Sequence, residues 1–125
     1  MSANPPLVSV VDDDESVREA LPDLLRELGF DAEGFASAEE FLASDDVGRT
    51  HCLVLDVTMP GMSGPELRVE LARRGSAIPI VFMTAQQDQS VRARVLSGCA
   101  VAYLSKPFGD TALDHAVRLA LGVRS

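Results

Sequence analysis

The sequence predicts a doubly wound α/β fold, in which one parallel sheet lies between two layers of helices. Five short apolar runs alternate with five segments of helical character through the 125 residues. Such alternation is typical of a parallel sheet with helices on both faces. The length suits one domain with a substantial core, and the apolar share of 46% argues against disorder. We expect a three-layer (βα)5 sandwich with the flavodoxin-like strand order 2-1-3-4-5.

The first strand and the first helix lie at the start of this alternation. Residues 7–11 (LVSVV) form a β-branched apolar run that predicts a buried strand. Apolar side chains at helical spacing predict a helix over 15–28 that stops near Gly29. Pro22 conflicts with this helix, because it removes one backbone hydrogen bond and should introduce a kink.

The next three elements are a weak strand, a short helix and a strong strand. Residues 32–35 are weakly apolar, and the helix over 38–43 has Ser37 as its expected N-cap. The run CLVLDV at 52–57 is apolar on both faces until Asp56, as in a parallel strand with helices on both sides. The loop TMPGMSG then leads into the second half of the fold.

The second half alternates helix and strand in the same way. A helix over 65–73 begins with proline in its first turn, which suits a helix start. The apolar runs 78–84 and 101–105 predict the fourth and fifth strands, and apolar side chains at helical spacing predict helices over 88–98 and 109–122. These ten elements account for nearly the whole chain.

The charge and the composition exclude several classes of function. The net charge of −8 argues against binding of nucleic acid or an anionic membrane by this chain itself. The start, MSANPP, lacks a signal peptide, and no apolar run approaches the length of a membrane span. We therefore expect a cytoplasmic protein in which Cys52 and Cys99 are free thiols in packed surroundings.

Polar side chains follow four of the strands at the point where each strand ends. Asp12 and Asp13 follow the first strand, Asp56 ends the third, Thr84 ends the fourth and Lys106 follows the fifth. The carboxyl ends of parallel strands share one edge of the sheet, where ligands bind in this class of fold. Three carboxylates there would repel one another unless a hard cation such as Mg²⁺ joins the lysine. This combination suits phosphoryl transfer to a carboxylate nucleophile.

Four motifs strengthen this interpretation. VVDDDE, LVLDVTMPGMSG, PIVFMTA and YLSKPF resemble the receiver domain of two-component response regulators, in the FixJ- and NarL-type branch. The resemblance runs from about residue 6 to residue 122, so we expect residues 1–125 to form a single receiver domain. It implies a cytoplasmic signalling domain that catalyses only its own phosphorylation and dephosphorylation, and is otherwise not an enzyme.

The resemblance implies a phosphorylation and metal site. Asp56 resembles the phospho-acceptor, and Asp12 and Asp13 resemble the acidic pair that binds Mg²⁺ (or Mn²⁺) together with Asp56 and the backbone carbonyl of Thr58. Thr58 and Gln86 occupy positions that tune dephosphorylation in such domains. The direction of that tuning stays open.

It also implies a switch. Thr84 resembles the hydroxyl residue that moves to bond the phosphate, Lys106 the lysine that pairs with the phosphate, and Tyr103 the aromatic residue that rotates when Thr84 moves. The peptide bond between Lys106 and Pro107 resembles a cis peptide of the family. Tyr103 as an ordinary half-buried strand residue is the open alternative.

The expected function is a phosphorylation-activated switch whose partner is a sensor histidine kinase. Phosphorylation would alter the face made by the fourth helix, fifth strand and fifth helix, which carries Leu104, Arg94, Asp114 and Arg118, and would favour a homodimer. FixJ-type receivers usually continue into a DNA-binding domain that controls transcription. No output domain is expected in this chain, so a stand-alone relay or adaptor is an alternative.

Two other classes of protein share parts of the pattern. A phosphatase of the haloacid-dehalogenase type also uses an aspartyl nucleophile, Mg²⁺ and a lysine, but it needs a second aspartate where this chain has Thr58. An FMN carrier shares the topology, but the acidic sequence DDDE would repel the phosphate of the flavin. Asp14 or Glu15 is expected to cap the first helix, and His51 and His115 are expected to have surface or packing roles.

Overall fold

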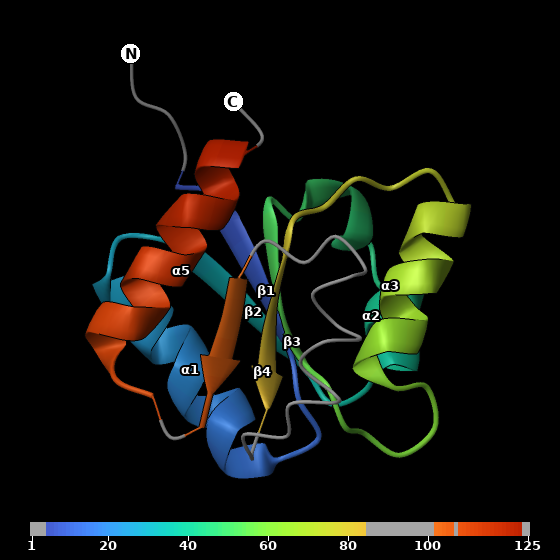
Figure 1. Ribbon diagram of the computed structural model, residues 1–125, viewed down its shortest axis with the longest axis horizontal. Helices are drawn as coiled ribbons and strands as arrows, with labels where there is room; N and C mark the ends of the chain where they lie inside the picture. The colour runs from blue at the N-terminus through green and yellow to red at the C-terminus, as the bar shows by residue number, and fades with distance from the viewer. Residues whose placement is uncertain (1–4, 85–101, 107, 124–125) are drawn as a thin grey trace.

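The computed structural model describes residues 5–84, 102–106 and 108–123, and it confirms the predicted fold (Figure 1). A five-stranded parallel sheet has the order β2-β1-β3-β4-β5. The predicted helix over 88–98 lies outside the described residues. The described strands are β1 (Leu7–Val11), β2 (Asp31–Phe35), β3 (Cys52–Asp56), β4 (Ile80–Thr84) and β5 (Ala102–Ser105). The described helices are α1 (Glu15–Glu27), α2 (Ala38–Ala43), the 3-10 helix η1 (Val47–Arg49), α3 (Gly64–Arg73) and α5 (Asp110–Val123).

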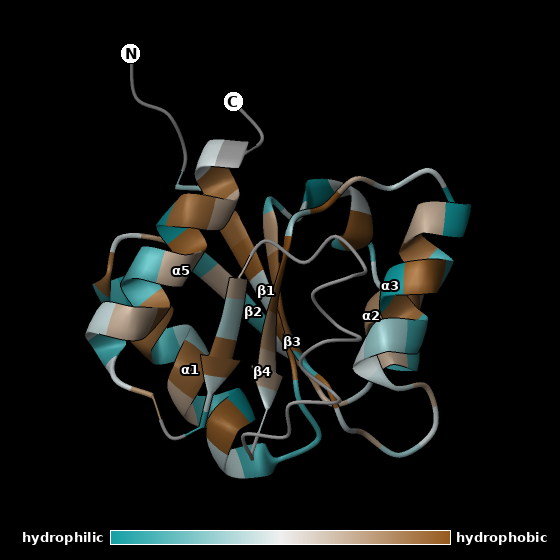
Figure 2. Ribbon diagram, in the orientation of Figure 1, coloured by the Kyte–Doolittle hydropathy of each residue, from teal (hydrophilic) through white to brown (hydrophobic). Residues whose placement is uncertain are grey.

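The sheet separates two apolar cores. In Figure 1, α1 and α5 lie on one side of the sheet, and α2 and α3 lie on the other. Side chains alternate between the two cores along each strand, so that Val54 of β3 packs on the side of α1 and α5 while Leu55 packs on the opposite side. Figure 2 shows hydrophobic colouring along the central strands, as expected for strands covered on both faces.

The strand register brings the polar strand ends together. Val11 of β1 is paired with Leu55 of β3, and Asp56 is paired with Met83 of β4. Asp12, the residue after β1, therefore follows its strand at the same level as Asp56. One edge of the sheet thus carries the polar residues that the sequence predicts there.

The helix starts follow local capping rules. The Asp14 side chain accepts a hydrogen bond from the Ser16 N–H and caps α1, and Ser37 caps α2 in the same way through the Glu40 N–H, both as predicted. Pro22 is buried inside α1, and the helix continues through it to Glu27. The predicted conflict therefore does not end the helix.

Neutral hydrogen bonds hold the amino-terminal part of β1 to the segment before β3. The hydroxyl oxygens of Ser9 and Thr50 are 2.6 Å apart and buried, and the Thr50 hydroxyl also donates to the carbonyl of Asp46 at 2.6 Å. The Leu7 N–H donates to His51 Nδ1 at 3.1 Å, and the His51 N–H donates to the Leu7 carbonyl at 2.8 Å. His51 is exposed, so it has the surface role that the sequence allowed.

The described residues bear on two general predictions. Cys52 is a fully buried free thiol, and burial raises its pKa to about 12, which keeps it protonated and unreactive. Cys99 lies outside the described residues. Within the described part of the chain, no helix has the length and apolar character needed to cross a membrane.

Candidate functional site

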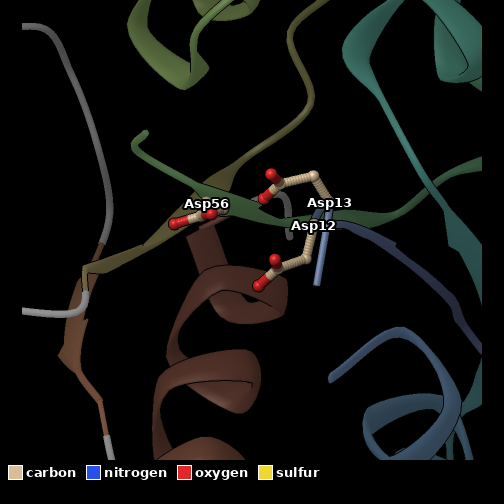
Figure 3. A group of neighbouring side chains, drawn as sticks. All are labelled: Asp12, Asp13 and Asp56. Carbon is tan, nitrogen blue, oxygen red and sulfur yellow. The ribbon is translucent and has the colours of Figure 1, made fainter. Parts of the chain in front are cut away.

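Three carboxylates meet at the carboxyl edge of the sheet. Asp12 and Asp13 follow β1 and Asp56 ends β3, and one oxygen of each lies within 4.8 Å of the others. Figure 3 shows the three side chains extending to the same side of the sheet edge. Asp12 and Asp56 are buried, whereas Asp13 is exposed to solvent. The predicted acidic cluster is therefore present, and one of its members faces solvent.

Lys106 supplies the positive charge of this site. Its Nζ lies 2.8 Å from Asp12 Oδ2 and 3.8 Å from Asp56 Oδ1, so its direct hydrogen-bond partner is Asp12. Burial alone lowers the pKa of Lys106, but the hydrogen bond that Lys106 donates to Asp12 and the negative charges of Asp56 and Asp12 outweigh burial and raise this pKa. Among the described residues, one ammonium thus faces three carboxylates, which leaves an excess of negative charge when all three are ionised.

The pKa of Asp56 reflects this excess of negative charge. Burial, and next the negative charge of Asp12, raise the pKa of Asp56 to about 6, although Lys106 and a hydrogen bond from the Thr58 backbone N–H act in the opposite direction. The ionised form is unfavourable in this surrounding without a further cation. A divalent ion bound by the carboxylates would favour the ionised form of Asp56.

The backbone around the acidic pair is held by its own neighbours. The Asp14 N–H donates to Asp12 Oδ1 at 2.9 Å. The guanidinium of Arg18, one turn into α1, donates to the carbonyls of Asp12 and Asp13 at 3.2 and 3.3 Å. The sequence prediction missed Arg18, because nothing in the sequence showed that its side chain would reach back to the loop.

The segment after Asp56 is fixed to β4 and to α3. The Val57 N–H donates to the Met83 carbonyl at 2.9 Å, and the Gly64 N–H donates to the Val57 carbonyl at 3.1 Å. A Cβ atom on Gly64 would lie 2.4 Å from the Asp56 carbonyl oxygen, so only glycine permits this approach of α3 to the end of β3. Met59 is buried in the core beneath the loop.

The predicted switch residues occupy the ends of β4 and β5. Thr84 is buried at the end of β4, and its carbonyl accepts a hydrogen bond from the Lys106 N–H at 2.7 Å. Tyr103 is half-buried and packs against the core on the side of α3. Gln86 and Pro107 lie outside the described residues. The structure therefore places Thr84 and Lys106 at the site edge but does not test the switch or the cis peptide.

The predicted partner face needs one correction, at Leu104, whereas Arg118 is exposed as predicted. Leu104 is buried in the core, so its side chain is not a surface contact. Arg118 pairs with Asp114 at 2.7 Å, donates to the Leu28 carbonyl at 3.2 Å, and lies over the ring of Phe30. Its side chain therefore binds the segment between α1 and β2, because a carbonyl and an aromatic face are available there. Arg94 lies outside the described residues.

Comparison with known proteins agrees with this geometry. The family model of the response regulator receiver domain matches residues 8–118. Nodulation protein W of Bradyrhizobium diazoefficiens is 46% identical over 111 residues, which are 89% of this chain and 49% of that protein. The transcriptional regulatory protein FixJ of Azorhizobium caulinodans is 40% identical over 115 residues, which are 92% of this chain and 54% of that protein. This chain thus spans about half the length of these curated relatives.

A solved structure gives the same result for the fold. The crystal structure of FixJ-N superposes with a TM-score of 0.85 at 34% identity, covering 98% of this chain and 96% of that one. The family match, the sheet order and the acidic cluster at the strand ends all agree. The chain therefore belongs to the response regulator receiver domain family, and it is a receiver domain rather than a classical enzyme.

Proposed function

We propose that this chain is a phosphorylation-activated signalling switch that accepts a phosphoryl group on Asp56 from a histidine kinase. The observation that carries the proposal is the meeting of Asp12, Asp13 and Asp56 beside Lys106 at the carboxyl edge of the sheet. A buried carboxylate nucleophile next to an ammonium and an acidic cluster suits phosphoryl transfer, where charge neutralisation and positioning supply most of the catalysis.

The donor set of the site fits a hard divalent cation such as Mg²⁺ or Mn²⁺. Three carboxylates lie within reach of one ion, and the single ammonium among the described residues compensates only part of their charge. Asp12, Asp13, Asp56 and the backbone carbonyl of Thr58 would hold the ion, with water completing its shell. When bound, the ion neutralises oxygens of the phosphoryl group during transfer.

The transfer step uses the carboxylate of Asp56 as the nucleophile. One Asp56 oxygen forms the new O–P bond while the N–P bond of the phosphohistidine breaks, and the imidazole nitrogen keeps the electron pair and takes up a proton from water. Lys106 lies close enough to Asp56 to pair with an oxygen of the incoming group. The Thr84 hydroxyl, at the neighbouring strand end, donates to another. The product is an acyl phosphate on Asp56.

Phosphorylation changes the surface of the protein through residues at the ends of β4 and β5. Movement of Thr84 toward the phosphate frees space for Tyr103, and the face formed with β5 and α5 changes its preference for partners, including a second copy of this chain. Thr58, which is exposed beside Asp56, and Gln86 set how fast water removes the phosphoryl group. A relative named as a transcriptional regulator supports control of transcription by the whole protein.

Intact-mass measurement tests the proposal directly. Wild-type protein treated with acetyl phosphate and Mg²⁺ is expected to gain the mass of one phosphoryl group, and EDTA is expected to prevent the gain. Asp56→Asn keeps the shape of the side chain but removes the nucleophile, so it should gain none. No gain in the wild type, or an equal gain in Asp56→Asn, would reject Asp56 as the acceptor.

A further inference from the structure

Glu39 reaches from α2 to the loop that follows the proposed phospho-acceptor. Its Oε2 accepts a hydrogen bond from the Met62 backbone N–H at 3.1 Å, across 23 residues of sequence. The helix that carries Glu39 is itself well anchored, because Ala38 and Phe41 on either side of it are fully buried. Glu39 thus connects a fixed helix to the far end of the loop.

The backbone beside Met62 is shaped to receive this carboxylate. Gly61 has a φ of +76°, a conformation that residues with a side chain adopt at a cost. A Cβ atom on Gly61 would lie 3.0 Å from Glu39 Oε2, which is closer than such contacts normally come. Glycine therefore meets two needs here, since it permits the turn and leaves room for the Glu39 carboxylate.

The same loop carries the groups that contact Asp56. The Thr58 backbone N–H donates to the Asp56 carboxylate, and its carbonyl is the expected fourth protein ligand of the cation. Met59 holds the loop from below as part of the core, but Thr58 and Gly61 are exposed. The bond from Thr58 to Asp56 holds the start of this segment, and the hydrogen bond that the Met62 N–H donates to Glu39 ties its far end to α2.

We infer that Glu39 is a positioning residue for phosphorylation of Asp56, and that it acts by holding the loop of residues 58–62 in the conformation that presents Thr58 to the site. This inference rests on the proposed function. Glu39 does not touch the reacting atoms. Its loss would let the loop sample other conformations, so that fewer molecules present the Thr58 N–H and carbonyl at any time.

The chain provides a matched control in the same turn of α2. Glu40 carries the same charge and is exposed, and its carboxylate makes no hydrogen bond within the described residues. Glu39→Ala and Glu40→Ala therefore change the net charge equally, but only the first removes the bond to the loop. Glu39→Gln removes the charge and keeps an oxygen that accepts from Met62.

The rate of phosphorylation by acetyl phosphate, followed by intact mass over a range of concentrations, separates these roles. Glu39→Ala should lower the limiting rate about threefold to tenfold, the range expected for loss of one hydrogen bond, with little change in the half-saturating concentration of acetyl phosphate. Glu39→Gln should restore most of the rate, and Glu40→Ala should match the wild type. Amide exchange at Met62, measured without phosphorylation, should be faster in Glu39→Ala alone.

Gly61→Ala gives an independent approach to the same contact, because its Cβ would displace the Glu39 carboxylate. It should slow phosphorylation as Glu39→Ala does, and combining the two changes should cost less than the sum of both. Equal rates in Glu39→Ala and Glu40→Ala, with unchanged exchange at Met62, would overturn the role of Glu39 while leaving the proposed function intact. A wild-type chain that gains no phosphoryl group on Asp56 would instead overturn the proposed function, and this inference with it.

Discussion

The two ends of the β-sheet are built in opposite ways. Near the amino end, the buried polar atoms of Ser9 and Thr50 are neutral and bond to each other and to the Asp46 carbonyl. Such a set stabilises the fold because each buried polar atom has a partner and no charge needs solvation. It involves no excess charge that would have to be balanced from outside the chain.

The carboxyl end collects negative charge that the described residues do not balance. One ammonium, on Lys106, serves three carboxylates, and the pKa of Asp56 is raised to about 6 by burial and by Asp12. The comparison indicates that the strand ends at the site are arranged for chemistry at the expense of stability.

The largest effect is expected when Lys106, the only lysine in the sequence, is replaced. Lys106→Met leaves Asp12, which is fully buried, without its charged partner, so the free energy of unfolding should fall by about 3 kcal/mol. Urea unfolding at pH 7 without divalent ions measures it. Arg73→Met, which removes an exposed ion pair with Glu70, is the control and should change little. A small loss in both variants would contradict the special role of the buried pair.

Removal of an acid at the same edge should have the opposite sign. Because the folded-state pKa of Asp56 lies above its ordinary value, its favourable contribution to stability is present below about pH 4 and is lost as the pH rises through about 6. Without divalent ions, Asp56→Asn should therefore match the wild type near pH 4 and exceed it by roughly 2–3 kcal/mol at pH 7. The measurement is the free energy of unfolding across this pH range. If the free energies of unfolding of the two proteins changed with pH in parallel, the pKa of Asp56 would not be raised in the folded state.

A smaller effect without pH dependence is expected near the amino end. Ser9→Ala removes one neutral hydrogen bond, while Thr50 keeps its bond to the Asp46 carbonyl, so the cost should be about 1 kcal/mol. The loss should be the same at pH 5 and pH 7 and the same with or without Mg²⁺. Urea unfolding under the four conditions measures it, and a loss that varies with Mg²⁺ would show that the two ends are coupled.

Much of the fold could be predicted because its signals are local. β1 and α2 begin and end where the sequence predicts. A run of β-branched residues specifies β1, and the Ser37 cap specifies the start of α2, so both signals lie within or next to the element. The short 3-10 helix η1 was not predicted, because three residues carry too little periodicity to detect. Pro22 was expected to conflict with α1, yet the helix continues through it, so the surrounding packing outweighs the local cost.

The acidic cluster could be predicted for a different reason. Asp12, Asp13 and Asp56 each follow an apolar run, and a parallel sheet brings such positions to one edge. Arg18 and Glu39 could not be found in this way, because their partners are backbone groups of loops whose paths the sequence does not specify. Leu104 was predicted to lie on the partner face. Side chains alternate between the two sides of the sheet along β5, and this alternation directs Leu104 into the core.

The charge imbalance at the carboxyl edge is tested most directly by the stability of the protein as a function of Mg²⁺ concentration. At pH 7 and constant ionic strength, the free energy of unfolding of the wild type should rise by about 1.4 kcal/mol for each tenfold increase in Mg²⁺ above its dissociation constant. Asp13→Asn alters an exposed side chain, so the variant should fold normally but show a much weaker rise. A wild type whose stability ignores Mg²⁺, or an Asp13→Asn variant with the same response, would contradict the account.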